Sequence, residues 1–110
     1  MTTAITPYKI AVPDAALADL KQRLANIRWP ERETCDGWNQ GLPLDYAQEL
    51  VHYWTNSYDW RRCENKLNGW EQFVNIIEGI DIHFIHHRSP HANALPLIIT
   101  HGWPGSIVEF

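Results

Sequence analysis

Apolar residues recur at helical spacing in the first part of the chain. The helix they predict opens at Pro13-Asp14 and ends at Pro30, which cannot continue a helix. Its polar residues lie off the apolar line. That line consists of Leu17, Leu20, Leu24 and Ile27. One amphipathic helix of this kind needs another element to cover its apolar face.

Two further helices are predicted downstream. Pro43 suits the first turn of a helix that fades by Asn56. Asp59 is a good N-cap for a third helix, which ends near Asn68 and Gly69. The wide apolar face of the second helix suggests burial against more than one partner, and it carries Tyr46, Ala47, Leu50, Val51, Tyr53 and Trp54.

The periodicity then changes to that of strands. Residues 73–77 and 80–85 predict a hairpin, with Glu78-Gly79 as its tight turn. Residues 8–12 predict a short extended segment near the start of the chain. Leu97, Ile98 and Ile99 form a continuous apolar run, which is typical of a strand covered on both faces.

A glycine- and proline-rich loop follows this last apolar run. His101-Gly102-Trp103-Pro104-Gly105 cannot continue a strand, because Pro104 donates no backbone hydrogen bond. Ser106 suits a helix N-cap, and Glu109 three residues later completes a capping box. A strand that opens onto a helix N-terminus presents free backbone N–H groups, which favour negative charge.

Composition and charge narrow the classes of function. The 110 residues are 45% hydrophobic and 20% charged, which is ordinary for a globular protein. The net charge of −4 gives no indication of a nucleic-acid partner. We expect neither a signal peptide nor a membrane anchor, because the start is polar and no run of about 18 apolar residues occurs. Cys35 and Cys63 follow no pattern, which favours two reduced thiols and a cytoplasmic location over a disulfide.

The loop also carries a family resemblance. His101-Gly102-Trp103-Pro104-Gly105-Ser106 resembles the loop after the third strand of α/β-hydrolases, and its Trp version is similar to that of microsomal-type epoxide hydrolases. Matches to the same family occur in the same order upstream and cover nearly the whole chain: Arg28-Trp29-Pro30, Gly37-Trp38, Tyr53-Trp54, Tyr58-Asp59-Trp60-Arg61 and Gly79-Ile80-Asp81-Ile82-His83-Phe84.

The resemblance implies an α/β fold of which this chain holds an incomplete part. Residues 1–71 would form a helical N-terminal meander. Residues 72–110 would begin the α/β-hydrolase core with the hairpin, the third strand, the oxyanion loop and the start of the first core helix. The implied activity is the opening of epoxides to diols by water through an alkyl-enzyme ester, with no metal and no organic cofactor.

Site roles follow from the same resemblance. The backbone N–H of Trp103 would donate to the oxyanion, and its ring would line the substrate pocket. His101 would orient the loop rather than act as the catalytic base. Gly102 and Pro104 would shape the turn, with a cis bond before Pro104 as in many members of the fold.

The sequence lacks the other catalytic parts of such an enzyme. A nucleophile elbow, Gly-x-nucleophile-x-Gly, is expected after the oxyanion loop. The nearest pattern, Gly79-Ile80-Asp81, precedes the loop and lies in a predicted hairpin strand. We therefore expect the 110 residues alone to be inactive.

Two other features have simpler interpretations than ligand binding. The four histidines near the hairpin show no recognised metal-ligand spacing, so they are interpreted as polar surface positions: His83, His86, His87 and His91. The six tryptophans lack regular spacing and are interpreted mainly as packing residues.

Several alternatives remain open at this stage. The chain could belong to another α/β-hydrolase, an esterase or a haloalkane dehalogenase. It could instead be a Trp-rich binding module without catalysis, or a gene fragment without its own function. An apolar strand edge without a neighbour further predicts self-association.

Overall fold

The structure, a computed structural model, describes residues 4–110. The chain divides into two compact units. The helical unit is Ala11–Glu64, and the sheet unit combines the residues up to Ile10 with Asn65–Phe110. Helix α3 (Trp60–Leu67) begins in the helical unit and ends in the sheet unit. None of the helices in residues 4–110 is both long enough and apolar enough to cross a membrane.

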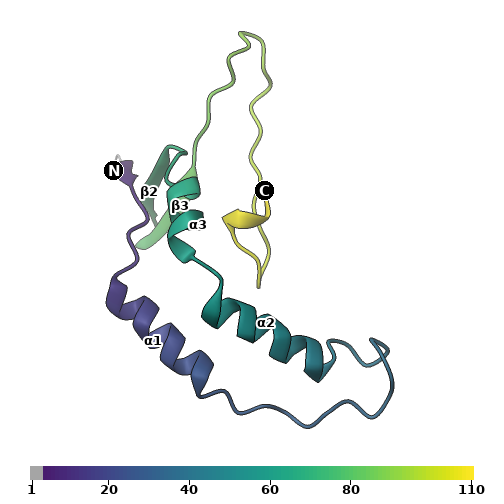
Figure 1. The fold of residues 1–110 in the computed structure, drawn as a ribbon. Helices are drawn as coiled ribbons and strands as arrows, with labels where there is room; N and C mark the ends of the chain where they lie inside the picture. Colours follow the sequence, from purple (N-terminus) through teal and green to yellow (C-terminus); the bar gives the residue numbers. More distant parts are fainter. Residues whose placement is uncertain (1–3) are drawn as a thin grey trace. The chain divides into compact units, whose positions relative to one another are not determined.

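The helical unit contains α1 (Asp14–Ala25) and α2 (Leu44–Asn56), which contact each other (Figure 1). Both begin directly after a proline, Pro13 or Pro43, which has an extended backbone and lies at the N-cap; Pro43 is thus one position before the first turn in which it was predicted. Helix α1 ends at Ala25, earlier than the predicted Pro30. The reason is Asn26, which leaves the helical conformation at φ −109° and donates its side-chain amide to Gln22 O at 3.0 Å.

Side chains of the loop between α1 and α2 bond to the first turn of α2. The Glu33 carboxylate accepts the backbone N–H of Leu44 at 2.9 Å, and Arg32 forms an ion pair with Asp45 in the first helical turn. Trp38, expected to be a packing residue, lies edge-on against Tyr46 with ring centroids 5.1 Å apart. Side chains therefore satisfy helix-start donors that no backbone carbonyl reaches.

Helix α3 begins as the sequence predicts. Asp59 Oδ1 accepts the N–H of Arg61 at 2.9 Å, which is the bond expected of an N-cap aspartate. Glu64, only 6% exposed, accepts the backbone N–H of Val12 and one N–H of Arg61, both at 2.7 Å. Arg61 also donates to Asp14. This polar cluster fixes the segment before α1 against α3.

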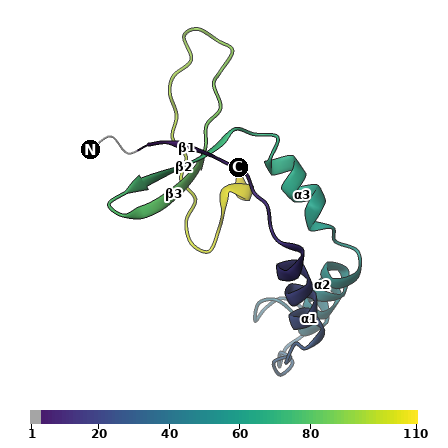
Figure 2. The same ribbon diagram turned by 90° about the vertical axis from the view of Figure 1, so that its left-hand side faces the viewer.

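The sheet unit is built on a three-stranded antiparallel sheet (Figure 2). Its strands are β1 (Thr6–Tyr8), β2 (Gln72–Ile77) and β3 (Ile80–Ile85), in the order β1-β2-β3. The predicted hairpin is confirmed. Its turn residues Glu78 and Gly79 have φ values of 52° and 83°, and a type I′ turn requires both to be positive.

Polar side chains tie β1 and the end of α3 to the hairpin. Asn68 Oδ1 accepts the N–H of Ile10 at 2.9 Å, and Asn68 Nδ2 donates to Ile10 O at 2.8 Å. The buried Gln72 donates to Leu67 O at 2.8 Å. Its Oε1 lies 2.9 Å from His83 Nε2. The predicted extended segment over residues 8–12 is therefore partly correct: the strand itself is Thr6–Tyr8, and Ile10 is held by a side chain instead.

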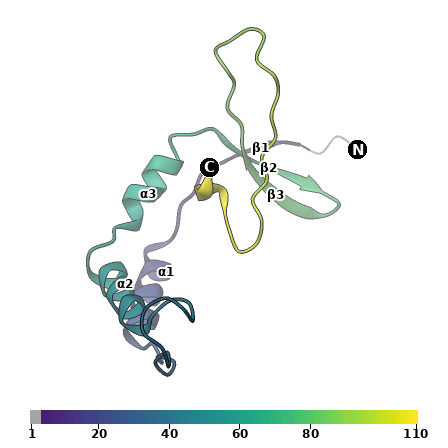
Figure 3. The same ribbon diagram turned by 90° about the vertical axis from the view of Figure 1, so that its right-hand side faces the viewer.

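The predicted buried strand over residues 97–99 does not form. The segment from His86 to Thr100 carries no strand and can be followed as a long loop (Figure 3). Leu97 is 79% exposed and Ile98 is 89% exposed. A strand requires hydrogen bonds to a neighbour, and none of the strands in residues 4–110 pairs with this segment. None of the apolar residues in the same range is buried.

Candidate active-site loop

The loop at residues 101–106 makes a tight turn. Gly105 N–H donates to Gly102 O at 2.7 Å, which closes a four-residue turn around Trp103 and Pro104. The bond between Trp103 and Pro104 is cis, as predicted, and this is the isomer found in type VI turns. The turn is therefore a defined backbone structure rather than an irregular connection.

A short helical turn follows the loop. Ser106 has an extended backbone, and its hydroxyl accepts the N–H of Val108 at 3.3 Å, which confirms the predicted N-cap. The element it caps is the single 3₁₀ turn η1 (Ile107–Glu109) instead of the expected start of an α-helix. The Glu109 carboxylate lies against Gly105, where a side chain would displace it.

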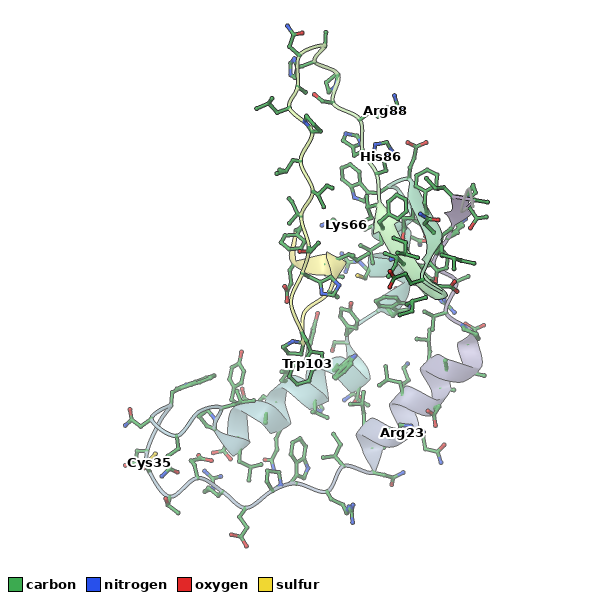
Figure 4. The ribbon with its side chains drawn as sticks, turned by 180° about the vertical axis from the view of Figure 1, so that it is seen from behind. Arg23, Cys35, Lys66, His86, Arg88 and Trp103 are labelled. Carbon is green, nitrogen blue, oxygen red and sulfur yellow. The ribbon has the colours of Figure 1, made fainter. Side chains whose placement is uncertain are left out.

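Trp103 lies at the tip of the loop (Figure 4). Its side chain is 96% exposed. Its backbone N–H makes no hydrogen bond within residues 4–110, whereas the N–H of Gly105 is used in closing the turn. An unpaired backbone N–H in a fixed turn can donate to an oxygen atom that gains negative charge. The next residue, Pro104, has no N–H to offer.

His101 and Gly102 flank this donor. His101 Nδ1 lies 3.4 Å from Gly102 O, a long contact that is a hydrogen bond only in the tautomer that carries its proton on Nδ1, because the carbonyl can only accept. A side chain at Gly102 would meet no atom within 4 Å. The described part of the chain brings His101, Gly102, Trp103 and Pro104 together only as neighbours in sequence, and the expected pocket around the Trp103 ring is not formed by it.

A cavity of about 360 Å³ lies elsewhere, in the loop of the helical unit. Hydrogen bonds satisfy two of its three acidic groups, Glu33 and Asp45. The bond from Leu44 N–H lowers the pKa of Glu33, and the bond from Arg32 lowers the pKa of Asp45. Both carboxyls are thus poor proton acceptors near neutral pH. The cavity is lined by Arg32, Glu33, Thr34, Cys35, Asp36, Gly37, Pro43 and Asp45.

No metal centre is evident in the described part of the chain. Residues 4–110 hold no group of three or more His, Cys, Asp or Glu side chains placed to share an ion. Cys35 and Cys63 are both free thiols. The only candidate chemistry that we assign to these residues is therefore hydrogen bonding from the loop backbone.

Sequence reasoning missed the polar residues that fasten the N-terminal segment. The sequence pattern predicted no hydrogen-bond partner for Glu64, Asn68 or Gln72. Their partners Val12, Ile10 and His83 lie outside the local sequence of each residue. One signal was available at Asn68. An asparagine at the end of a helix can hydrogen-bond a neighbouring backbone, although its partner Ile10 could not be read from the sequence.

Comparison with known proteins identifies what this arrangement is similar to. The sequence model of the family described as "Epoxide hydrolase N terminus" matches residues 5–110. A protein of Stigmatella aurantiaca, named as an epoxide hydrolase, is 58% identical over 106 residues, which cover 96% of this chain and 24% of that protein. Epoxide hydrolase 1 of Sus scrofa is 36% identical over 97% of this chain and 24% of its own length.

Solved structures agree with the sequence relatives. The structure of Aspergillus niger epoxide hydrolase superposes with a TM-score of 0.83 at 32% identity, over 97% of this chain and 29% of that one. The three helices and the antiparallel sheet match the N-terminal part of this α/β-hydrolase. The chain spans about a quarter of the length of the curated relatives that it matches.

Proposed function

The chain belongs to the family defined by the N terminus of epoxide hydrolases, and on this premise we propose that it supplies one oxyanion donor, the backbone N–H of Trp103, to an epoxide-opening enzyme. The substrate class is an epoxide, and the product is a vicinal diol. The observation that carries the proposal is the unpaired Trp103 N–H at the tip of a closed turn.

The chemistry assigns this donor to one step. A carboxylate nucleophile opens the epoxide and forms an alkyl-enzyme ester. Water then attacks the ester carbonyl, whose oxygen becomes negative in the tetrahedral intermediate. A fixed N–H is effective there because it needs no reorganisation as the charge develops. His101, Gly102 and Pro104 hold the loop in position, and the Trp103 ring would face the substrate.

The remaining catalytic groups have no match in the 110 residues. The sequence contains no Gly-x-nucleophile-x-Gly elbow. We therefore propose that these residues act only together with a core and a cap that provide the nucleophile, the proton donors and the base. The division at residues 71 and 72, between a helical meander and the start of that core, is part of the same proposal.

The decisive experiment removes the Trp103 N–H without changing the side chain. Residues 5–110 would replace the matching segment of the 58% identical Stigmatella aurantiaca protein. The α-hydroxy analogue of tryptophan at position 103 then converts the amide into an ester, which lacks the N–H. We expect kcat for diol formation to fall about 10²- to 10³-fold, the loss typical of one oxyanion donor.

A matched backbone ester at Ile107 controls for the chemistry of the substitution. It lies in the turn after the loop and has no assigned catalytic role, so its kcat should stay near that of the parent chimera. Equal kcat values for the two ester variants would overturn the assignment to Trp103. Accumulation of the alkyl-enzyme ester in the Trp103 variant alone would locate the defect in hydrolysis.

Two smaller proposals accompany this function. The free thiols Cys35 and Cys63 fit a reducing compartment, so we propose a cytoplasmic location. The exposed apolar segment at residues 95–99 supports self-association of the 110-residue chain. Localisation of a tagged protein tests the first proposal, and sedimentation at several concentrations tests the second.

A further inference from the structure

Asn68 holds residues 6–10, which include β1 and which we call the N-terminal segment, and it also precedes a glycine. Its side-chain amide forms two hydrogen bonds with the backbone of Ile10, one accepted at 2.9 Å and one donated at 2.8 Å. It also accepts a longer bond of 3.3 Å from Gln72 Nε2. Asn68-Gly69 is the only Asn-Gly pair in the sequence. We call the two bonds to Ile10 the Asn68 clamp.

An Asn-Gly pair has a chemical reaction of its own. The backbone nitrogen of the glycine attacks the side-chain carbonyl carbon of the asparagine and loses its proton, and ammonia leaves as the carbon–nitrogen bond of the amide breaks. Water then opens the resulting cyclic imide at either carbonyl, giving aspartate or isoaspartate. Asparagine is accordingly among the thermally labile residues.

We propose that Asn68 is a spontaneous deamidation site that the clamp protects and whose reaction releases the N-terminal segment. In the folded chain both reacting groups are occupied. The amide of Asn68 is bonded to Ile10, and the attacking nitrogen of Gly69 donates to Lys66 O at 3.1 Å. Deamidation therefore requires the segment and the helix end to open first.

The structure explains why the labile pair is present. A side chain at position 69 would lie 3.1 Å from the carbonyl oxygen of Lys66, so a residue larger than glycine is disfavoured there. Position 68 needs a donor and an acceptor on one short side chain, a combination that asparagine provides. The residues that the fold selects at these two positions are thus the ones that deamidate.

The product cannot restore the clamp. Aspartate at position 68 is an acceptor only, so the donor to Ile10 O is lost and a carboxylate oxygen faces that carbonyl. Isoaspartate additionally inserts a backbone methylene at the end of α3. Either product leaves the carbonyl of Ile10 without its donor, and the repulsion between this carbonyl and the carboxylate opens the clamp, which also exposes the Ile10 N–H. The reaction is irreversible and would fix the segment in its released state.

The rate of deamidation gives the first test. The 110-residue chain is incubated at neutral pH in buffer and in urea, and peptide mapping by mass spectrometry follows aspartate and isoaspartate at position 68. We expect conversion to be at least about tenfold slower in buffer, since opening breaks the two bonds between the Asn68 side chain and Ile10 and the bond from Gly69 N–H to Lys66 O. Equal rates in the two solutions would overturn the protection.

Hydrogen exchange of the Asn68→Asp variant gives the second test. We expect the amide of Ile10 to lose protection while the paired amides of β2 and β3 keep theirs. Asn65→Asp is the matched control, because it makes the same charge change on α3 and its side chain has no hydrogen bond within residues 4–110. If the Ile10 amide stays protected in Asn68→Asp, the segment is not released. If the amides throughout β2 and β3 also lose protection, the release is not local. Either result would refute the proposal.

Discussion

His83 Nε2 lies 2.9 Å from Gln72 Oε1, so a histidine on β3 is bonded to a glutamine that is only 3% exposed. The imidazole ring also lies against Tyr8, with ring centroids 4.9 Å apart. Because Gln72 accepts at Oε1, the proton of neutral His83 is on Nε2. One histidine thereby connects β1, the hairpin and, through Gln72, the end of α3.

The stability of the sheet unit should depend on pH through His83. Burial lowers the pKa of His83 below its ordinary value of 6.5, because the neutral ring is favoured in the partly desolvated site. The unfolded chain therefore binds more protons than the folded one as the pH falls below 6.5. Stability should decrease over that window. The urea midpoint should be lower at about pH 5.5 than at neutral pH.

The His83→Phe variant isolates this effect. Phenylalanine keeps an aromatic ring beside Tyr8 but cannot take up a proton. We expect a lower midpoint at neutral pH, because Gln72 loses its partner, and a smaller change between the two pH values. An unchanged difference between the two pH values would assign the effect to another group.

A second pH window is expected in acid, at Glu64. The bond from Val12 N–H, followed by that from Arg61, lowers the pKa of this carboxyl below its ordinary value of 4.5. Its contribution to stability is thus complete above pH 4.5 and is lost as the pH falls through the lowered folded pKa. Glu64→Gln should lower the urea midpoint at neutral pH and reduce its fall in acid.

Glu49→Gln provides the control for this substitution. Glu49 is exposed on α2 and has no hydrogen bond from its side chain within residues 4–110. The Glu49→Gln substitution therefore removes the same charge as Glu64→Gln but leaves the hydrogen bonds of Glu64 intact. If both variants shift the midpoint equally, the effect belongs to net charge rather than to the bonds with Val12 and Arg61.

The hairpin turn offers a stabilising substitution. Glu78 has a φ of 52°, a left-handed conformation that costs most residues about 1–2 kcal/mol and that asparagine tolerates better. Glu78→Asn should therefore stabilise the chain by roughly 0.5–1 kcal/mol. Gly79→Ala, at a φ of 83°, should destabilise it. Thermal unfolding of both variants measures the two changes, and a destabilised Glu78→Asn would argue against this turn geometry.

Local chemistry explains which elements the sequence predicted. The starts of α1 and α2 follow from Pro13 and Pro43, and the hairpin from alternation around Glu78-Gly79. The turn at Trp103-Pro104 and the Ser106 cap are likewise local. Each of these features depends on residues within a few positions of one another, so it can be predicted from the sequence.

Long-range partners explain what could not be predicted. The pairing of Thr6 with Val74 joins residues 68 positions apart, and the bonds from Ile10 to Asn68 join residues 58 positions apart. The strand predicted from Leu97 to Ile99 had the right composition but no neighbour within residues 4–110. The roles of His101, Gly102, Trp103 and Pro104 stay predictions, because they concern groups outside these residues.

The apolar segment before the active-site loop should cause the 110-residue chain to self-associate. Ile98 is 89% exposed in a segment that forms no strand and pairs with no strand in residues 4–110. The unpaired backbone of such an apolar segment can pair with a second copy. Ile98→Lys should weaken association about tenfold or more, since burial of one isoleucine contributes about 1.5–3 kcal/mol. Thr100→Lys adds the same charge nearby without removing an apolar side chain and should have a smaller effect. Sedimentation velocity over a range of concentrations measures both, and a parent chain that remains monomeric throughout would contradict the prediction.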